Sequence, residues 1–208
     1  MKRVIVYCEG PTEETFVNRV LAPAFEHKQI FLYASSCNGV SKYSIIKRDL
    51  TTLCKHDQSA IITTMLDYYA LPMDTPGMRD CIPGTIYDKV KHIEAKILED
   101  IGADNLLPNL MLHEFEALLF SNPKCFSYCG LRARDIDLLC SIRDEADTPE
   151  HINNDPNTAP SKRILRIYPE YNKVLDGFHI AQDIGLETMR AECRHFDEWI
   201  STIDALET

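Results

Sequence analysis

Polar residues that suit metal binding follow three apolar segments of this chain, at the point where each segment ends. The segments and the residues after them are 3–8 with Glu9, 60–66 with Asp67, and 109–112 with His113 and Glu114. Glu13 and Glu116, close by in the sequence, complete the candidate set. Clustered carboxylates suit Mg²⁺ or Mn²⁺. Such a metal would serve phosphoryl chemistry, by activating water and neutralising charge on the phosphate.

The turn after the first segment is the most informative stretch. An apolar run cut off by Glu9-Gly10-Pro11-Thr12 predicts a buried strand that enters a tight turn. Thr12 followed by carboxylates indicates a helix start with an acidic first turn. Glu9 and Glu13 are therefore expected to face a common point. The alternative is that Glu9 is an ordinary turn residue and Glu13 serves only the helix dipole.

The elements that must position these residues alternate along the chain. Apolar runs predict strands at 3–8, 29–35, 60–66 and 109–112, and helical spacing predicts helices at 13–26, 41–55, 85–100 and 114–120. This order predicts an α/β fold of the Rossmann-like kind, with a mostly parallel four-stranded sheet and helices on both faces. The strand exits should then share one edge of the sheet.

The second half of the chain has a helical pattern. Helices are expected at 131–146, 161–167 and 186–206, with a polar loop at 148–160 and a short helix at 171–175. We therefore predict an α/β core at 1–122 and a helical extension at 123–208 that packs on it, as a single compact domain. Trp199, in the terminal helix, is expected in the core or in a partner interface.

Composition limits the classes of function. The formal charge is −10 over 208 residues, which argues against tight, unaided binding to nucleic-acid phosphates but leaves a nuclease open if a partner supplies a basic surface. No apolar run reaches the roughly 20 residues of a membrane span, and the first apolar run is too short for a signal peptide. We expect a cytoplasmic protein whose eight scattered cysteines are free thiols.

Two motifs resemble those of the Toprim fold, which topoisomerases, primases and OLD-type nucleases share. The stretch from Val6 to Glu13 resembles the first motif, a strand followed by Glu-Gly and a later acid. Met65-Leu66-Asp67-Tyr68-Tyr69 resembles the second motif, a strand that ends in Asp-x-Asp. Tyr69 stands where the second aspartate is expected, so Glu114 or Glu116 would have to fill that place.

The chain resembles more closely a bacterial Toprim-like family of unknown function, related to the OLD-type nucleases. The resemblance rests on E-G-P-T-E at 9–13, D-Y-Y-A-L-P at 67–72, H-E-F-E-A-L-L-F at 113–120 and P-S-K-R-I at 160–164. It implies a nuclease that depends on Mg²⁺ or Mn²⁺ and works with an ABC- or AAA-type ATPase in defence against phage. It also implies a late lysine that stabilises charge on the phosphate, for which Lys162 is the candidate.

These observations support a nuclease, with DNA as the foremost substrate and contact to the nucleic acid made through a partner. Its catalytic residues would be Glu9, Asp67 and Lys162, its metal ligands Glu9, Glu13, Asp67, Glu114 and Glu116, and its further candidates His113 and Arg163. Since Glu114 and Glu116 are two positions apart, one helix face cannot carry both. Lys173 is expected in solvent, and Tyr68 and Tyr69 are expected to pack rather than to stack on bases.

Two other functions stay open. The first is a non-catalytic regulatory subunit of an ATPase complex, favoured by Tyr69 and by the acidic composition. The second is a primase-like or phosphatase-like use of the same metal site. The choice between DNA and RNA, the number of metal ions and the oligomeric state are also open.

Overall fold

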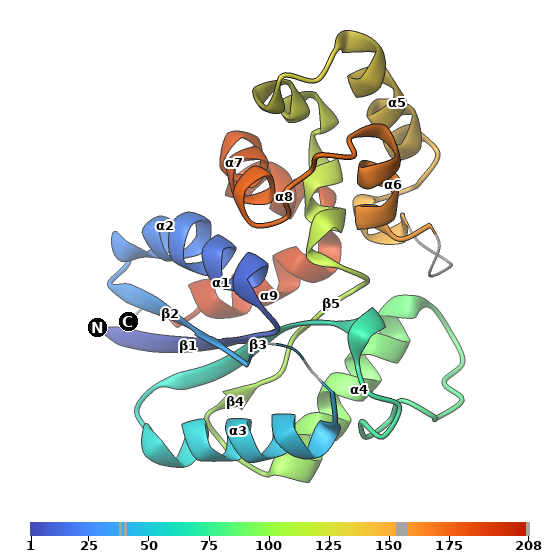
Figure 1. The fold of residues 1–208 in the computed structure, drawn as a ribbon. Helices are drawn as coiled ribbons and strands as arrows, with labels where there is room; N and C mark the ends of the chain where they lie inside the picture. Colours follow the sequence, from blue (N-terminus) through green and yellow to red (C-terminus); the bar gives the residue numbers. More distant parts are fainter. Residues whose placement is uncertain (38, 40, 153–157, 207–208) are drawn as a thin grey trace.

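A parallel β-sheet forms the centre of the protein (Figure 1). The computed structural model describes residues 1–37, 39, 41–152 and 158–206. Strand β1 (Lys2–Cys8) lies between β2 (Ile30–Ser36) and β3 (Ile61–Asp67), and both pairings are parallel. Two short strands, β4 (Leu106–Leu107) and β5 (Leu110–Met111), both pair in parallel with β3. All carboxyl ends therefore point to one edge, as the strand order predicts.

The edge strand is interrupted at Pro108. Proline has no backbone N–H to donate to the neighbouring strand. Asn109 bridges the gap, because its backbone N–H donates to Thr64 Oγ1 (2.9 Å) and its side-chain amide donates to the Thr64 carbonyl (3.3 Å). The strand predicted at 109–112 therefore corresponds to β5, the second of two short strands at this edge. The first of them, β4, was not predicted from the sequence.

The helix after β1 contains an unusual turn. Helix α1 (Pro11–Phe16) continues through a π-helical turn (Val17–Leu21) into α2 (Ala22–Glu26). Pro23 lacks an N–H, and its ring would clash with the carbonyl of the preceding α-helical turn. The wider π turn before it keeps the chain helical. The helical segment therefore runs past Pro23 to Glu26, where the sequence predicts its end.

Helices cover both faces of the sheet, which confirms the predicted α/β fold class (Figure 1). Helices α3 (Tyr43–His56) and α4 (Ile86–Ile101) pack on one face, where Ile62 and Val90 belong to a common apolar core. Helices α1 and α2 pack on the opposite face together with the last helix, α9 (Arg194–Asp204).

Helix α9 lies directly on the sheet. The indole Nε1 of Trp199 donates to Thr63 Oγ1 in β3 (2.9 Å), and the Trp199 ring packs edge-on against Phe196. Trp199 is 4% exposed, in keeping with the expectation of a core residue. The last helix of the chain therefore completes the core that begins with β1.

The segments between the sheet and α9 are helical and mostly short. In order they are the 3₁₀ segment Tyr68–Ala70 after β3, the 3₁₀ helices η3 (Phe115–Ser121) and η4 (Pro123–Cys129), helix α5 (Ala133–Asp144), the 3₁₀ turn η5 (Pro149–His151), and helices α6 (Pro160–Ile167), α7 (Leu175–Ile184) and α8 (Leu186–Glu192). The single helix expected at 186–206 is wrong, because the extended backbone of Cys193 separates α8 from α9.

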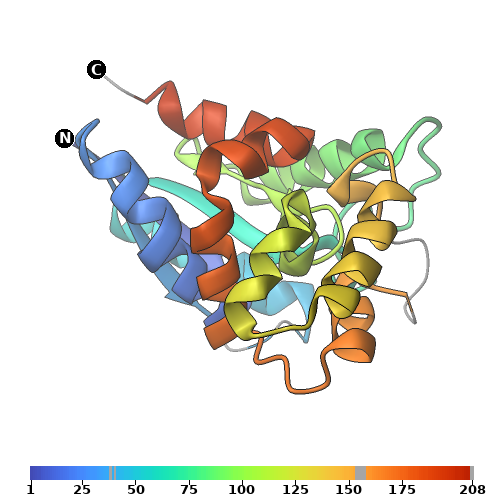
Figure 2. The same cartoon turned by 90° about the horizontal axis from the view of Figure 1, so that it is seen from above.

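The sequence analysis also missed α7, which lies between α1 and η3 (Figure 2). Gly177, near the start of α7, has a low helix propensity, so the sequence of this segment does not stand out as helical. A Cβ at this position would lie 2.9 Å from Tyr171 Oη and 3.2 Å from Phe115 Cε1. Glycine therefore allows α7 to approach η3 closely.

Two further expectations concern the chain as a whole. All eight cysteines lie in the described residues and are free, as expected. No helix in the described residues has the length and apolar composition needed to span a membrane.

A buried carboxylate joins η5, α4 and α9. Glu150 is 3% exposed and accepts the backbone N–H groups of His195 (3.1 Å) and Phe196 (3.0 Å), which begin α9. The hydroxyl of Tyr87 in α4 donates to the same carboxylate (3.0 Å). Glu150 thus satisfies donors at a helix start that would otherwise be buried and unpaired.

We expect Glu150→Ala to lower the free energy of unfolding by about 2 kcal/mol, because it leaves these buried donors without acceptors. Urea unfolding followed by circular dichroism measures this change. Glu187→Ala is the matched control, since the Glu187 side chain is 88% exposed, and surface changes of this kind usually stay within about 0.5 kcal/mol. Equal midpoints for the two variants would contradict the role given to Glu150.

Candidate metal centre

The carboxyl ends of β1 and β3 meet at a hollow of about 360 Å³. Glu9 directly follows β1, and Asp67 is the last residue of β3. Glu13 in α1 and Lys173 also line the hollow. Neighbouring parallel strands bring their ends together at one edge of a sheet, which explains why residues far apart in sequence share this space.

Glu9 and Asp67 carry buried oxygens that lack partners. Neither Glu9 Oε2 nor Asp67 Oδ1 has a hydrogen-bond partner within the described part of the chain. Burial and the nearby carboxylates of Glu13, Glu9 and Glu116 raise the pKa of Asp67 well above its usual range. Burial likewise raises the pKa of Glu9, although the backbone N–H of Asp67 donates to its carboxylate. Without an added cation, these groups favour holding protons.

Glu13 serves both the helix and the hollow. Its Oε2 accepts the backbone N–H of Gly10 (3.0 Å), as part of a capping arrangement at the start of α1. Burial, followed by the charges of Glu116 and Glu9, raises its pKa to about 7. Glu13 therefore has the helix role that the sequence left as an alternative, and it also lies among the other acids.

Lys173 is the cation in contact with these acids. Its Nζ lies 3.0 Å from Oε1 of Glu116, which is 1% exposed. Burial lowers the pKa of Lys173, but the carboxylates of Glu116, Glu114 and Asp67 raise it further, so the net shift is upward. The ammonium thus stays charged. The Lys173 side chain is 46% exposed, as expected for a solvated residue, but its ammonium is paired with Glu116.

Glu114 and Glu116 reach the centre in different ways. Glu114 has extended backbone before η3, and its Oε2 accepts the N–H of Ser161 (3.0 Å) at the start of α6. Its charge still raises the pKa of Glu9 and of Glu116. Glu114 lies outside the helix, so the two glutamates do not need to share one helix face.

The other predicted residues lie away from the hollow. Lys162 is exposed on α6 and forms no ion pair with the residues described here. Arg163 Nε donates to the carbonyl of Thr158 (2.8 Å). His113 lines a neighbouring cleft, and burial together with His151 lowers its pKa to about 4, so its imidazole is neutral.

The donor set fits a hard divalent cation, because every nearby donor is a carboxylate oxygen and two of these oxygens are buried without partners. Within the described ranges, however, no three acidic, histidine or cysteine side chains stand close enough to form a complete metal site. Lys173 neutralises part of the cluster instead. A bound cation would therefore draw the remaining carboxylates together and displace protons from them.

We expect Lys173→Met to lower the free energy of unfolding by about 1 kcal/mol at pH 7, because it leaves the buried Glu116 carboxylate without its counter-ion. The estimate is modest because the Lys173 side chain is 46% exposed. Urea unfolding measures the change. In the Glu116→Gln background the same substitution should cost almost nothing, and strict additivity of the two substitutions would contradict the pairing.

Comparisons with known proteins give a family match and similar solved structures. The family described as a domain of unknown function (DUF4276) matches residues 8–204. A search of the curated proteins found no match. Among solved structures, the C-terminal region of the Burkholderia pseudomallei OLD protein is similar, with 16% identity, a TM-score of 0.48, and coverage of 97% of this chain and 98% of that chain.

The C-terminal region of the Xanthomonas campestris pv. campestris OLD protein is similar in two structures. One has 14% identity, a TM-score of 0.41 and coverage of 97% of this chain and 98% of that chain. The other has 14% identity, a TM-score of 0.43 and coverage of 100% and 98%. At such scores, the function must be inferred from the residues of this chain.

Proposed function

We propose, for a chain that belongs to the DUF4276 family, that the acidic hollow is the active site of a nuclease dependent on Mg²⁺ or Mn²⁺. The observation that carries this proposal is the pair of buried carboxylate oxygens on Glu9 and Asp67, which have no hydrogen-bond partner among the described residues and lie at adjacent strand ends beside a charged lysine. Oxygen donors that bind a metal ion, together with an ammonium group, suit a phosphodiester. Its phosphate is anionic, and negative charge builds up on the phosphate oxygens during hydrolysis.

Each side chain has a distinct part in this proposal. Glu9 and Asp67 would hold the metal, with Glu13, Glu114 and Glu116 as the other candidate ligands. When bound, the metal would supply a water of lowered pKa and positive charge toward the phosphate. Glu114 or Glu116 would then fill the acidic place that Tyr69 leaves empty in the second Toprim-like motif, since the charges of both raise the pKa of Asp67.

The ammonium of Lys173 would orient a phosphate oxygen and stabilise its charge. We assign this part to Lys173 rather than to Lys162, because Lys173 Nζ contacts the buried acid Glu116, whereas Lys162 forms no ion pair with the described residues. Glu13, with a pKa of about 7, is suited to accept a proton near neutral pH.

A partner would supply the basic surface that binds nucleic acid, because this chain has a net charge of −10 and would repel phosphates. We propose an ATPase subunit of the ABC or AAA type for this role, and a setting in phage defence, from the motif resemblance. The test is to incubate the purified chain, alone and with such an ATPase, with plasmid DNA and with RNA in Mg²⁺ or Mn²⁺. Metal-dependent cleavage that Glu9→Gln abolishes supports the proposal, and identical behaviour of the two proteins contradicts it.

A non-catalytic regulatory subunit is the second candidate. It is favoured by Tyr69 at the place of an acid and by the lack of a preformed three-ligand metal site in the described residues. Calorimetric titration with Mn²⁺ separates the two candidates. Binding in the micromolar range that Asp67→Asn removes supports the catalytic site, whereas no binding to either protein favours the regulatory subunit.

A further inference from the structure

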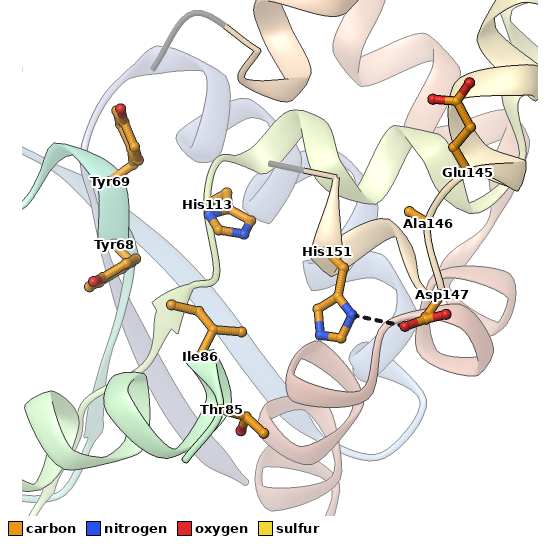
Figure 3. A pocket seen from close by; sticks show the side chains of 9 residues that line it. All are labelled: Tyr68, Tyr69, Thr85, Ile86, His113, Glu145, Ala146, Asp147 and His151. Carbon is orange, nitrogen blue, oxygen red and sulfur yellow. Dashed lines mark ion pairs between the residues drawn. The ribbon is translucent and has the colours of Figure 1, made fainter. Parts of the chain in front are cut away.

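A larger cleft of about 650 Å³ is lined by residues that adjoin the acidic centre in the sequence, and Figure 3 shows this lining. One wall comes from the chain after β3, with Tyr68 and Tyr69. The opposite wall comes from the segment after α5, with Asp147, and from η5, with His151. Figure 3 shows His113 between the two walls. The cleft is therefore bordered by planar side chains from three separate segments.

The cleft and the acidic hollow are joined through the backbone at two places. Tyr68 directly follows Asp67, and His113 directly precedes Glu114. Successive Cα atoms are about 3.8 Å apart. The cleft and the acidic hollow are therefore neighbours along the backbone, and a single substrate could extend over both.

The charges of the cleft select against a phosphate. Among the described residues, its lining includes the acids Glu145 and Asp147 and no lysine or arginine. The Asp147 side chain is 95% exposed, so it stands at the open side of the cleft. Carboxylates repel phosphate oxygens but accept hydrogen bonds from an exocyclic amino group. The ligand should therefore present an uncharged, amino-bearing part here.

The ring surfaces favour a flat aromatic ligand. Tyr69 is 39% exposed although it is a large aromatic residue. His113 is 7% exposed, and its Nδ1 has no hydrogen-bond partner among the described residues. Aromatic side chains beside a nucleic-acid site stack on bases, each stacked base contributing about 1–3 kcal/mol. A buried imidazole nitrogen without a partner adds a polar group that a ligand can satisfy.

We propose that this cleft receives an unpaired nucleobase with an exocyclic amino group, from the strand whose phosphate lies at the acidic hollow. The inference rests on the proposed nuclease function and narrows its substrate to single-stranded or locally unpaired nucleic acid. A duplex hides the faces of its bases in the stack, so the base must leave the stack to enter. The prediction that Tyr68 and Tyr69 only pack is thereby replaced for Tyr69.

The test uses free nucleosides, so that no metal and no cleavage are needed. Adenosine, cytidine and thymidine are titrated into the ¹⁵N-labelled full chain, and amide shifts are followed by NMR. We expect saturable shifts at residues 68–69, 113 and 145–147 with adenosine and cytidine, and at least tenfold weaker binding by thymidine. Tyr69→Ala should weaken adenosine binding at least tenfold. Tyr33→Ala is the matched control, because Tyr33 is an exposed tyrosine on β2.

The outcomes separate this inference from the proposed function. Adenosine binding in the cleft by a wild-type protein that shows no metal-dependent cleavage, alone or with the ATPase, supports the base cleft and rejects the catalytic proposal. Metal-dependent cleavage without any nucleoside shift in the cleft, and with full activity in Tyr69→Ala, overturns the base cleft and leaves the catalytic proposal standing. Equal binding of cytidine and thymidine overturns the amino-group preference. Shifts of the cleft residues by an ATPase partner alone, with none by nucleosides, overturn the inference in favour of a protein interface.

Discussion

Asp67→Asn should reduce metal-dependent cleavage by on the order of 10³-fold, without a loss of folding. The carboxylate lies at the end of β3, and its Oδ1 is buried without a hydrogen-bond partner in the described chain. Replacing it by an amide removes a negative metal ligand, and a loss of about 4 kcal/mol in transition-state stabilisation corresponds to this factor. Initial rates with a labelled single-stranded oligonucleotide measure it.

The same substitution replaces a buried carboxyl group, which burial and neighbouring acids make costly to ionise, by an amide that is always neutral. The neutral amide should therefore leave the metal-free protein at least as stable as wild type, which separates lost chemistry from lost structure. Glu14→Gln is the control for a neighbouring acid, since Glu14 does not line the hollow. Activity in Asp67→Asn within threefold of wild type would remove Asp67 from the catalytic centre.

Mg²⁺ or Mn²⁺ should stabilise the protein strongly at pH 8 and weakly at pH 5. The carboxyl pKa of Glu13 is raised from 4.5 to about 7, and that of Asp67 is also raised. A raised carboxyl pKa contributes stability below the unfolded pKa and loses it as the pH rises through the folded pKa. For Glu13 this loss is on the order of 3 kcal/mol between pH 4.5 and pH 8.

A bound cation offsets this loss, because it takes the place of the protons. At 100 times its dissociation constant a ligand adds about 2.7 kcal/mol, which for a protein of this size raises the melting temperature by roughly 5–10 °C. Scanning calorimetry at both pH values measures the effect. Glu13→Gln should be more stable than wild type at pH 8 without metal, and the two should converge at pH 5. Equal metal stabilisation of wild type and Asp67→Asn at pH 8 would contradict the site.

The first part of the site could be predicted because its signals are local. A strand, a tight turn and an acidic helix start are readable within 3–16, and together they position Glu9 and Glu13. Asp67 follows from the end of an apolar run, since parallel strands bring their ends to one edge. The fold class follows from the same alternation of strands and helices.

Lys173 could not be predicted, because its place depends on distant packing. It lies in a polar stretch before α7, and that helix is concealed by Gly177. The close approach of α7 to η3 brings Lys173 to Glu116, and no spacing in the sequence encodes this approach. Lys162 is the lysine of the P-S-K-R-I motif, but the local sequence cannot decide which of the two lysines contacts a buried acid.

The division of the outer strand at Pro108 affects how this protein can associate with other chains. An unprotected sheet edge offers a continuous row of backbone donors and acceptors to which a second molecule can add a strand, and proline at an edge prevents this. At the β4–β5 edge this row is short and interrupted, because β4 and β5 have two residues each and Pro108 lies between them. The opposite edge, β2, is seven residues long and carries the exposed Tyr33. Aggregation by strand addition is therefore expected to begin at β2, and a charged residue in place of Tyr33 should suppress it.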